Sequence, residues 1–284
     1  MTLTDEIEAA FLAACREEVE ALKPGNVHIF SSGHGMTAEQ FFVSAEAAAP
    51  ALCAPGKPVG ERVYDAVSAS FAAVGLNTNL GIVLLCAPLA AAAENGGAAL
   101  QTELARVLAG LDQSDAEQVF AAIRLANPGG LGTAPRHDVH GPATVTLLLA
   151  MAEAADRDLI AAQYATNFRD VFVTGLAALE KAHACGLKSP WTAVVVYLTF
   201  LSAFPDSHIV RKHGAAAAVE TQQQASAMLS LLQTKKEESF DALLAFDEEL
   251  KLQRRNPGTS ADLTVATLFA DRLRNILLKR HNDG

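Results

Sequence analysis

The stretch WTAVVVYLTFLSAFPDSHIVRKHG, residues 191–214, decides how the rest of the chain is interpreted. Its first part is a long apolar run. Its second part, residues 204–214, brings together one carboxylate, two imidazoles, one guanidinium and one ammonium. Charged side chains are costly to bury unless they are paired or bind something charged. A dense polar cluster after an apolar run therefore indicates a site, and its composition suits an anion together with a cation or a hydroxyl.

The composition predicts an all-α protein. Of the 284 residues, 50% are hydrophobic and only 19% are charged, aromatic residues are scarce, and no long stretch alternates as a strand would. The apolar runs 80–93 and 191–203 are shorter than the roughly 20 residues that a membrane crossing needs, so they are interpreted as core helices. We expect residues 1–284 to form one multi-helix domain around a central apolar helical core.

Charge and cysteine content exclude several classes of partner. The formal net charge is −10, which argues against binding nucleic acid or an anionic membrane surface. The four cysteines are far apart, with neither C-x-x-C nor zinc spacing, and are expected to be reduced and buried: Cys15, Cys53, Cys86 and Cys185. These features predict a cytoplasmic protein with small-molecule partners, and a homo-oligomer is compatible with them.

Helix starts and stops are well marked. The expected helices include 4–22, one that begins after a Thr37–Gln40 capping box, 114–126 with a Ser114–Glu117 box, 142–155, 164–184, one from Ser189-Pro190 and a last one over 261–280. Between the helices lie segments that are rich in glycine and polar residues. In a helical bundle such helix ends can converge on one pocket, and helix N-termini offer N–H groups to phosphate. We expect the segments 23–36, 75–81, 206–214 and 256–262 to meet around one pocket.

Each polar group in these loops also has a purely structural interpretation. Thr259, Ser260 and Asp206 are suitable N-caps, and the two asparagines Asn77 and Asn79 are suitable turn residues. His137, Asp138 and His140 have the side-chain types of a metal site, but their spacing is not specific to one.

Four segments resemble the triphosphoribosyl-dephospho-coenzyme A synthase family, the ATP:dephospho-CoA triphosphoribosyl transferases. They are Lys23-Pro24-Gly25-Asn26-Val27 with Gly33-His34-Gly35-Met36; Gly75-Leu76-Asn77-Thr78-Asn79-Leu80-Gly81; residues 206–214; and Asn256-Pro257-Gly258-Thr259-Ser260-Ala261-Asp262-Leu263. The last is similar to the family's Ser-Pro-Gly-Gly-Ser-Ala-Asp-Leu element and is the most specific. Together the similar segments extend over nearly the whole chain.

The resemblance implies an ATP-dependent transferase. It would move a 5-triphosphoribosyl group from ATP to a hydroxyl of dephospho-CoA or a related cofactor precursor, release adenine, and use Mg²⁺ with ATP. Residue chemistry and motif position then suggest roles. The catalytic candidates are His34, Asp138 and His208; the nucleotide- and phosphate-binding candidates are Lys23, Asn26, Asn77, Asn79, Arg211, Lys212, His213, Thr259 and Ser260; and the metal-binding candidates are Asp206 and Asp262.

Two other functions remain open from the sequence. Gly35 stands where the family motif has an acid, and Asn79-Leu80 where it has His-Lys, so a non-catalytic nucleotide-binding protein on the same fold is one alternative. Hydrolysis of an N-glycosidic bond is the other. The sequence contains no G-x-x-x-x-G-K-[ST] motif, which argues against P-loop phosphotransfer.

Overall fold

The computed structural model describes residues 1–97, 99–234 and 236–283. Within these ranges the secondary structure is helical, and β pairing is limited to isolated bridges in the loop after α1. The prediction of an all-α fold is thus confirmed. The elements are α1 (Leu3–Glu20), α2 (Ala38–Leu52), α3 (Val59–Val74), α4 (Leu80–Glu94), α5 (Leu100–Ala109), α6 (Gln113–Ala126), α7 (Leu147–Ala154), α8 (Leu159–Ala165), the π-helix η1 (Asp170–Gly175), α9 (Leu176–Ala184), α10 (Trp191–Ala203), α11 (Ser207–His213), α12 (Ala215–Thr234), α13 (Lys236–Leu252) and α14 (Gly258–Asp283).

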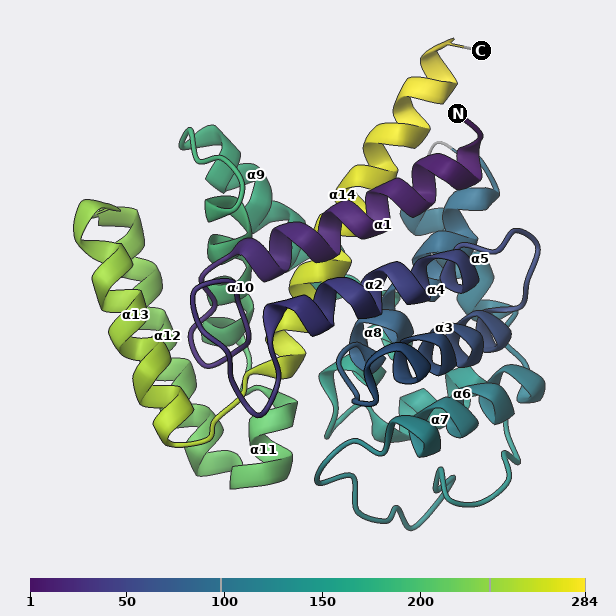
Figure 1. Ribbon diagram of the computed structural model, residues 1–284. Helices are drawn as coiled ribbons and strands as arrows, with labels where there is room; N and C mark the ends of the chain where they lie inside the picture. The colour runs from purple at the N-terminus through teal and green to yellow at the C-terminus, as the bar shows by residue number, and fades with distance from the viewer. Residues whose placement is uncertain (98, 235, 284) are drawn as a thin grey trace.

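Helix α4 lies in the core. Its sequence is apolar all round, which is the pattern of a helix buried on every side, and it packs against α1, α2, α3, α5 and α14. The α1 and α14 helices cross the molecule side by side, so the two termini lie at one end (Figure 1). The buried apolar residues of α4, α10 and α14 belong to one continuous cluster, which confirms the predicted central apolar core.

The short α11 helix is held between two layers. On one side α12 and α13 form a hairpin that packs against α10 and α11, as Figure 1 shows in green, and on the other α11 contacts the start of α14. The polar residues 204–214 therefore lie where the ends of several helices meet.

Two predicted helices differ from the observed ones. The stretch 164–184 is not one helix, because Asn167 and Phe168 adopt left-handed backbone conformations that bury the Phe168 ring and separate α8 from η1. The helix expected from residue 142 begins only at Leu147, where the Thr146 hydroxyl accepts a hydrogen bond from the third N–H of the helix. In both cases a tertiary contact or a cap overrides the local pattern.

The helix caps agree in part with the sequence. The Thr37–Gln40 capping box of α2 is confirmed. Helix α6 instead begins at a box formed by Asp112 and Asp115, two residues before the expected one.

Two further findings concern burial and length. Cys185 is exposed at the end of α9, so the prediction that all four cysteines are buried is wrong for this residue. Among the described residues no single helix combines the length and apolarity of a membrane span; only the bent pair of α10 and α11 reaches them jointly.

Candidate active site

A cavity of about 480 Å³ opens where the ends of α4, α8, α11 and α14 meet. Every one of the four segments singled out in the sequence contributes to its lining, which confirms the expected convergence. The contributing residues include Asn26 and His34, Asn77, His208 with Arg211 and Lys212, and Thr259 with Asp262.

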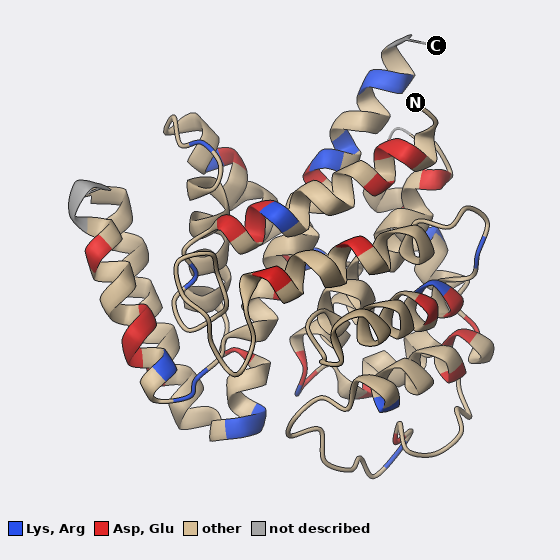
Figure 2. Ribbon diagram, viewed as in Figure 1, with Lys and Arg blue, Asp and Glu red and all other residues tan. Residues whose placement is uncertain are grey.

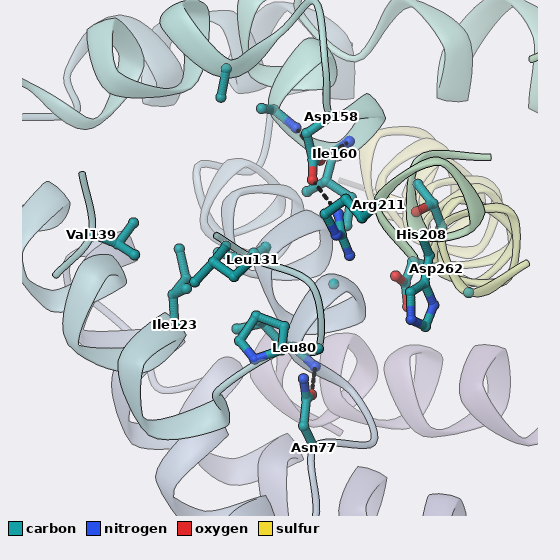
Figure 3. A pocket seen from close by; sticks show the side chains of 18 of the residues that line it. Asn77, Leu80, Ile123, Leu131, Val139, Asp158, Ile160, His208, Arg211 and Asp262 are labelled. Atoms are coloured by element: carbon teal, nitrogen blue, oxygen red, sulfur yellow. Dashed lines mark hydrogen bonds and ion pairs between the residues drawn. The ribbon is translucent and has the colours of Figure 1, made fainter. Parts of the chain in front are cut away.

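The cavity has two chemically different walls (Figure 3). Asp158, Arg211, His208 and Asp262 lie on one wall, from α8 and its cap, α11 and α14. The opposite wall carries apolar side chains from α6 and the loop after it, Ile123, Leu131 and Val139. One wall suits a base or another flat apolar group, and the other suits phosphates and hydroxyls.

Arg211 presents half of its guanidinium to the cavity. Its Nη1 donates to Asp158 Oδ2 over 2.7 Å, and the other oxygen of Asp158 caps α8 by accepting from the N–H groups of Ile160 and Ala161. Nε is buried without a hydrogen-bond partner, and no described residue accepts from Nη2. These two parallel donors are the edge with which arginine binds a phosphate in bidentate fashion.

Asp262 is the cavity's unpartnered carboxylate. No hydrogen bond or ion pair reaches its oxygens from the described residues, and burial first, then the nearby charges of Glu18 and Asp206, raise its pKa well above the usual value. The carboxylate lies against the start of α4, because a Cβ added to Gly81 would meet Asp262 Oδ2 at 2.0 Å. The second glycine of the 75–81 segment is therefore required by this close approach.

The loop 127–132 after α6 brings backbone to the cations of α11. A Cβ at Gly129 would lie 2.9 Å from Lys212 Cε, and one at Gly130 would lie 3.3 Å from the Arg211 carbonyl oxygen. The Lys212 ammonium itself has no protein partner in the part of the chain that the structure describes. Lys212 is thus a second cation available to an anion in the cavity.

His34 is arranged as a base. Its Nε2 lies 2.8 Å from the Gly25 carbonyl oxygen. Since a carbonyl can only accept, Nε2 carries the proton of the neutral ring and Nδ1 keeps the lone pair. Burial, opposed by that hydrogen bond, lowers the pKa of His34, so the ring is neutral at pH 7. His34 also holds a left-handed backbone conformation (φ 55°), which non-glycine residues rarely adopt.

His208 faces the cavity from the first turn of α11. Burial and then the charges of Lys212 and Arg211 lower the pKa of His208 to about 3, so the ring is neutral over the physiological range. The ring packs on the start of α14, where a Cβ at Gly258 would lie 2.6 Å from its Nδ1.

Asp206 does not line the cavity but joins the two helices that do. Its Oδ1 accepts from the N–H groups of His208 and Ile209, and its Oδ2 accepts from both the N–H and the hydroxyl of Ser260 at 2.8 Å. Burial raises the pKa of Asp206, and these four hydrogen bonds oppose the rise by stabilising the ionised form. Metal binding by Asp206 and phosphate binding by Ser260 stay predictions. In this geometry Asp206 caps α11, and Ser260, in the first turn of α14, donates to it.

Lys23 is buried and does not line the cavity, and its ammonium has three partners. It pairs with Glu18 at 2.7 Å and donates to the Asn26 side chain and the Val27 carbonyl. Its assignment to phosphate stays a prediction that this geometry does not support. Asn26 does line the cavity, and its amide donates to Asn256 Oδ1 over 2.8 Å.

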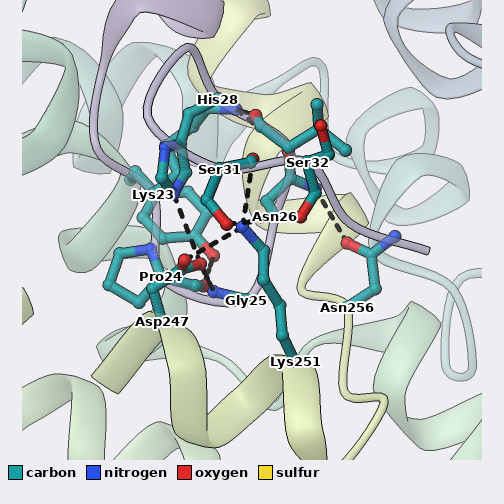
Figure 4. A network of polar contacts seen from close by, with 12 residues as sticks. Lys23, Pro24, Gly25, Asn26, His28, Ser31, Ser32, Asp247, Lys251 and Asn256 are labelled. Atoms are coloured by element: carbon teal, nitrogen blue, oxygen red, sulfur yellow. Dashed lines mark hydrogen bonds and ion pairs between the residues drawn. The ribbon is translucent and has the colours of Figure 1, made fainter. Parts of the chain in front are cut away.

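The loop 23–36 is fastened to α13 by a polar network (Figure 4). Asp247 accepts from the Gly25 N–H at 2.8 Å and pairs with Lys251, whose ammonium also donates to the Ser31 carbonyl. Gly25 is left-handed (φ 80°), and a Cβ there would lie 2.9 Å from the Arg255 carbonyl oxygen. The network fixes the carbonyl that orients His34.

The two asparagines of the 75–81 segment point in different directions. Asn77 lines the cavity, and its Oδ1 accepts from the Leu80 N–H at the start of α4. Asn79 turns away and donates to the Ser70 hydroxyl over 2.9 Å, so its nucleotide-binding role stays a prediction without support in the geometry.

Asp138 lines the far side of the cavity and organises its own loop. Hydrogen bonds from the His140 N–H, the Ala134 N–H and the His140 ring lower its pKa to about 2. Such a carboxylate is ionised at pH 7 and is a weak base, so the geometry favours His34 for proton transfer. His213 lies outside this cavity and donates from Nε2 to the Arg254 carbonyl.

Comparison with known proteins decides between the open alternatives. The model of one family, ATP:dephospho-CoA triphosphoribosyl transferase, matches residues 4–281. The chain belongs to this family. No curated protein matches. Among solved structures, a crystal structure from Archaeoglobus fulgidus described as a triphosphoribosyl-dephospho-CoA synthase is 28% identical, with a TM-score of 0.64 over 80% of this chain and 95% of that one.

The chain is therefore an enzyme, a transferase that acts in coenzyme biosynthesis by moving a triphosphoribosyl group from ATP to dephospho-CoA. Neither the non-catalytic binder nor the hydrolase is favoured. The resemblance identified in the sequence is confirmed over nearly the whole length.

Sequence reasoning missed three parts of the transferase's cavity. Asp158 has the pattern of an ordinary helix cap, and its pairing with Arg211 joins residues 53 positions apart. Glu18, near the end of α1, lines the cavity. The glycines at 129 and 130 have the pattern of a helix stop, although repeated glycine beside a proline also permits a close backbone approach.

Proposed function

We propose that the transfer takes place in this cavity, with ATP bound between its two walls. The observation that carries the proposal is the free Nε and Nη2 edge of Arg211, on the same wall as the unpartnered Asp262 and opposite an apolar wall. Arg211 and Lys212 bind the triphosphate, and the adenine rests on the apolar wall near Leu131. Asn26, Asn77 and Thr259 offer neutral groups to the ribose.

The reaction exchanges one bond at C1′ of the ribose. The bond from C1′ to the adenine nitrogen breaks, the acceptor hydroxyl oxygen forms the new bond, and the ribose passes through an oxocarbenium-like state. His34 Nδ1 takes the hydroxyl proton, because its lone pair is free and the ring is neutral. Adenine leaves with the electron pair of the broken bond and takes up one proton, which balances the one that His34 receives.

Asp262 fits a role in binding Mg²⁺ with the nucleotide. The carboxylate has no partner among the described residues, and burial first, then nearby negative charge, raise its pKa, so a cation would favour its ionised form. In the described residues no three His, Cys, Asp or Glu side chains form a metal cluster. Mg²⁺ in nucleotide sites is typically held by one or two carboxylates, substrate phosphates and water. Bound there, the ion would neutralise charge on the triphosphate.

The acceptor assignment is tested by product mass. Purified protein is incubated with ATP, Mg²⁺ and either dephospho-CoA or CoA, and the products are separated and weighed by mass spectrometry. We expect dephospho-CoA to gain one triphosphoribosyl group. Modification of CoA alone would contradict the proposed acceptor while leaving the transferase chemistry in place.

A further inference from the structure

A second, more open hollow adjoins the first and is lined entirely by basic side chains. Its lining consists of His34, Lys212, His213, Lys251 and Arg254. Two of them, His34 and Lys212, also line the main cavity, so the two spaces share a wall. Figure 2 shows the basic residues gathered at the end of α11 and at the end of α13 with the chain that follows. In a chain of net charge −10, this is a local reversal of sign.

The cations of this hollow are only partly neutralised by the protein. Lys251 pairs with Asp247, but neither the Lys212 ammonium nor the Arg254 guanidinium contacts an acceptor in the ranges that the structure describes. Arg254 is also left-handed (φ 57°), at a helix end where glycine is favoured. Two free cations at the mouth of one hollow form a site for a polyanion.

Contacts within the protein hold the edge of this hollow in place. His213 Nε2 donates to the Arg254 carbonyl over 2.9 Å, which ties the end of α11 to the chain after α13. The stem of Lys251 passes directly beneath the 23–36 loop, because a Cβ at Gly33 would lie 2.9 Å from Lys251 Cε. Lys251 then donates to the Ser31 carbonyl of that loop. These contacts hold the Lys251 ammonium and the Arg254 backbone close to the loop that carries His34.

We propose that this hollow binds the diphosphate of the acceptor, while the main cavity binds ATP. The inference rests on the proposed function. If His34 removes the proton of the attacking hydroxyl, the acceptor must approach it from the side that ATP does not fill. The hydroxyl and the diphosphate of dephospho-CoA are carried by one ribose, so the diphosphate lies about one sugar's width from the hydroxyl that faces His34. The basic hollow is the space that meets this requirement.

The test separates the two substrates kinetically. Arg254→Gln removes a cation of the hollow that does not line the ATP cavity, and Arg169→Gln, which removes an exposed arginine that lines neither space, serves as the control. With Arg254→Gln we expect the KM for dephospho-CoA to rise about fivefold or more and the KM for ATP to stay within twofold, because the variant loses a charge-assisted contact to the diphosphate that is weakened by its exposure to solvent. The control should change neither value.

Binding of pyrophosphate distinguishes failure of this inference from failure of the proposed reaction. Calorimetry with pyrophosphate is carried out on the wild type and Arg254→Gln, in the absence of metal and with ATP already bound. Weaker binding to Arg254→Gln than to the wild type supports the hollow as an anion site even if no product forms. Equal binding to both, or a rise in the KM for ATP alone, would overturn the assignment.

Discussion

At the scale of single residues, Arg211 carries the largest share of the proposed nucleotide recognition. Replacing Arg211 with alanine removes a bidentate, charge-assisted contact worth about 1.5–3 kcal/mol, so ATP affinity should fall roughly tenfold or more. Arg211→Lys should restore only part of it, because an ammonium cannot reproduce the two parallel donors. Isothermal titration calorimetry with Arg169→Ala as control measures the effect. Unchanged ATP affinity in Arg211→Ala would remove the residue from the site.

His208 should make the folded state sensitive to acid. Its pKa is about 3 in the folded protein, against 6.5 for a free imidazole. Between these values the unfolded chain binds more protons, so stability falls as the pH drops from about 6.5 towards 3. His208→Gln cannot take up this proton, and its melting temperature should decline less than that of the wild type between pH 7 and pH 4. Parallel declines would show that His208 is not held neutral.

The predicted site residues differ in whether the structure places them at the cavity. Arg211, His34 and Asp262 line it, as expected from their residue chemistry and their position in the motifs. The deep burial of Lys23 beside Glu18 depends on how the end of α1 folds back. The partner of Asp206 lies 54 positions away at Ser260, and no local pattern contains that information.

At the scale of elements, Asp206 and Asp262 should respond oppositely to the same change. Asp206→Asn replaces an oxygen that accepts hydrogen bonds with an NH₂ group that faces donors, so it loosens the joint between α11 and α14. We expect it to cost roughly 2–4 kcal/mol of unfolding free energy. Asp262→Asn removes an unpartnered carboxylate and should leave stability unchanged or higher, while abolishing most activity. Thermal unfolding and product assays on both variants check this, and a larger loss of stability in Asp262→Asn would contradict it.

The contact between the start of α4 and Asp262 of α14 can be isolated by a double-mutant cycle. Gly81→Ala places a methyl group where Asp262 Oδ2 now lies, and should destabilise the wild type. In an Asp262→Ala background the oxygen is absent, so the same substitution should cost less. Equal losses of melting temperature in the two backgrounds would show that the close approach is not what requires glycine.

Element boundaries were predictable where the sequence carries its own stop. Pro24-Gly25 predicted an end of the first helix near residue 22, and α1 ends at Glu20. The break at Asn256-Pro257 precedes α14, which begins at Gly258 rather than at the expected residue 261. The break at residues 166–169 was not predictable, because it is stabilised by burial of the Phe168 ring rather than by a local breaker. The presence of a helix can thus be predicted from hydrophobic periodicity and from its Pro-Gly stops, whereas a break within a predicted helix depends on tertiary packing.

At the scale of the whole molecule, an acidic chain must concentrate its few cations to bind ATP and an acidic acceptor. The two adjoining hollows gather such cations: Lys212 lines both, Arg211 lines the first and Arg254 the second. The composition predicted the need for such a region, since a net charge of −10 repels anions from most of the surface. The cations of residues 211–213 were expected to form this region from the sequence, whereas the contribution of Lys251 and Arg254 from α13 and the chain after it could be known only from the fold.

The most direct test of the account is the release of adenine. The wild type is mixed with ATP and Mg²⁺, with and without dephospho-CoA, and adenine and modified acceptor are quantified by HPLC. Transfer in this cavity predicts one adenine for each acceptor modified, little adenine without acceptor, and loss of both products in Arg211→Ala and Asp262→Asn. ATP binding without adenine release, or adenine release independent of the acceptor, would contradict the account.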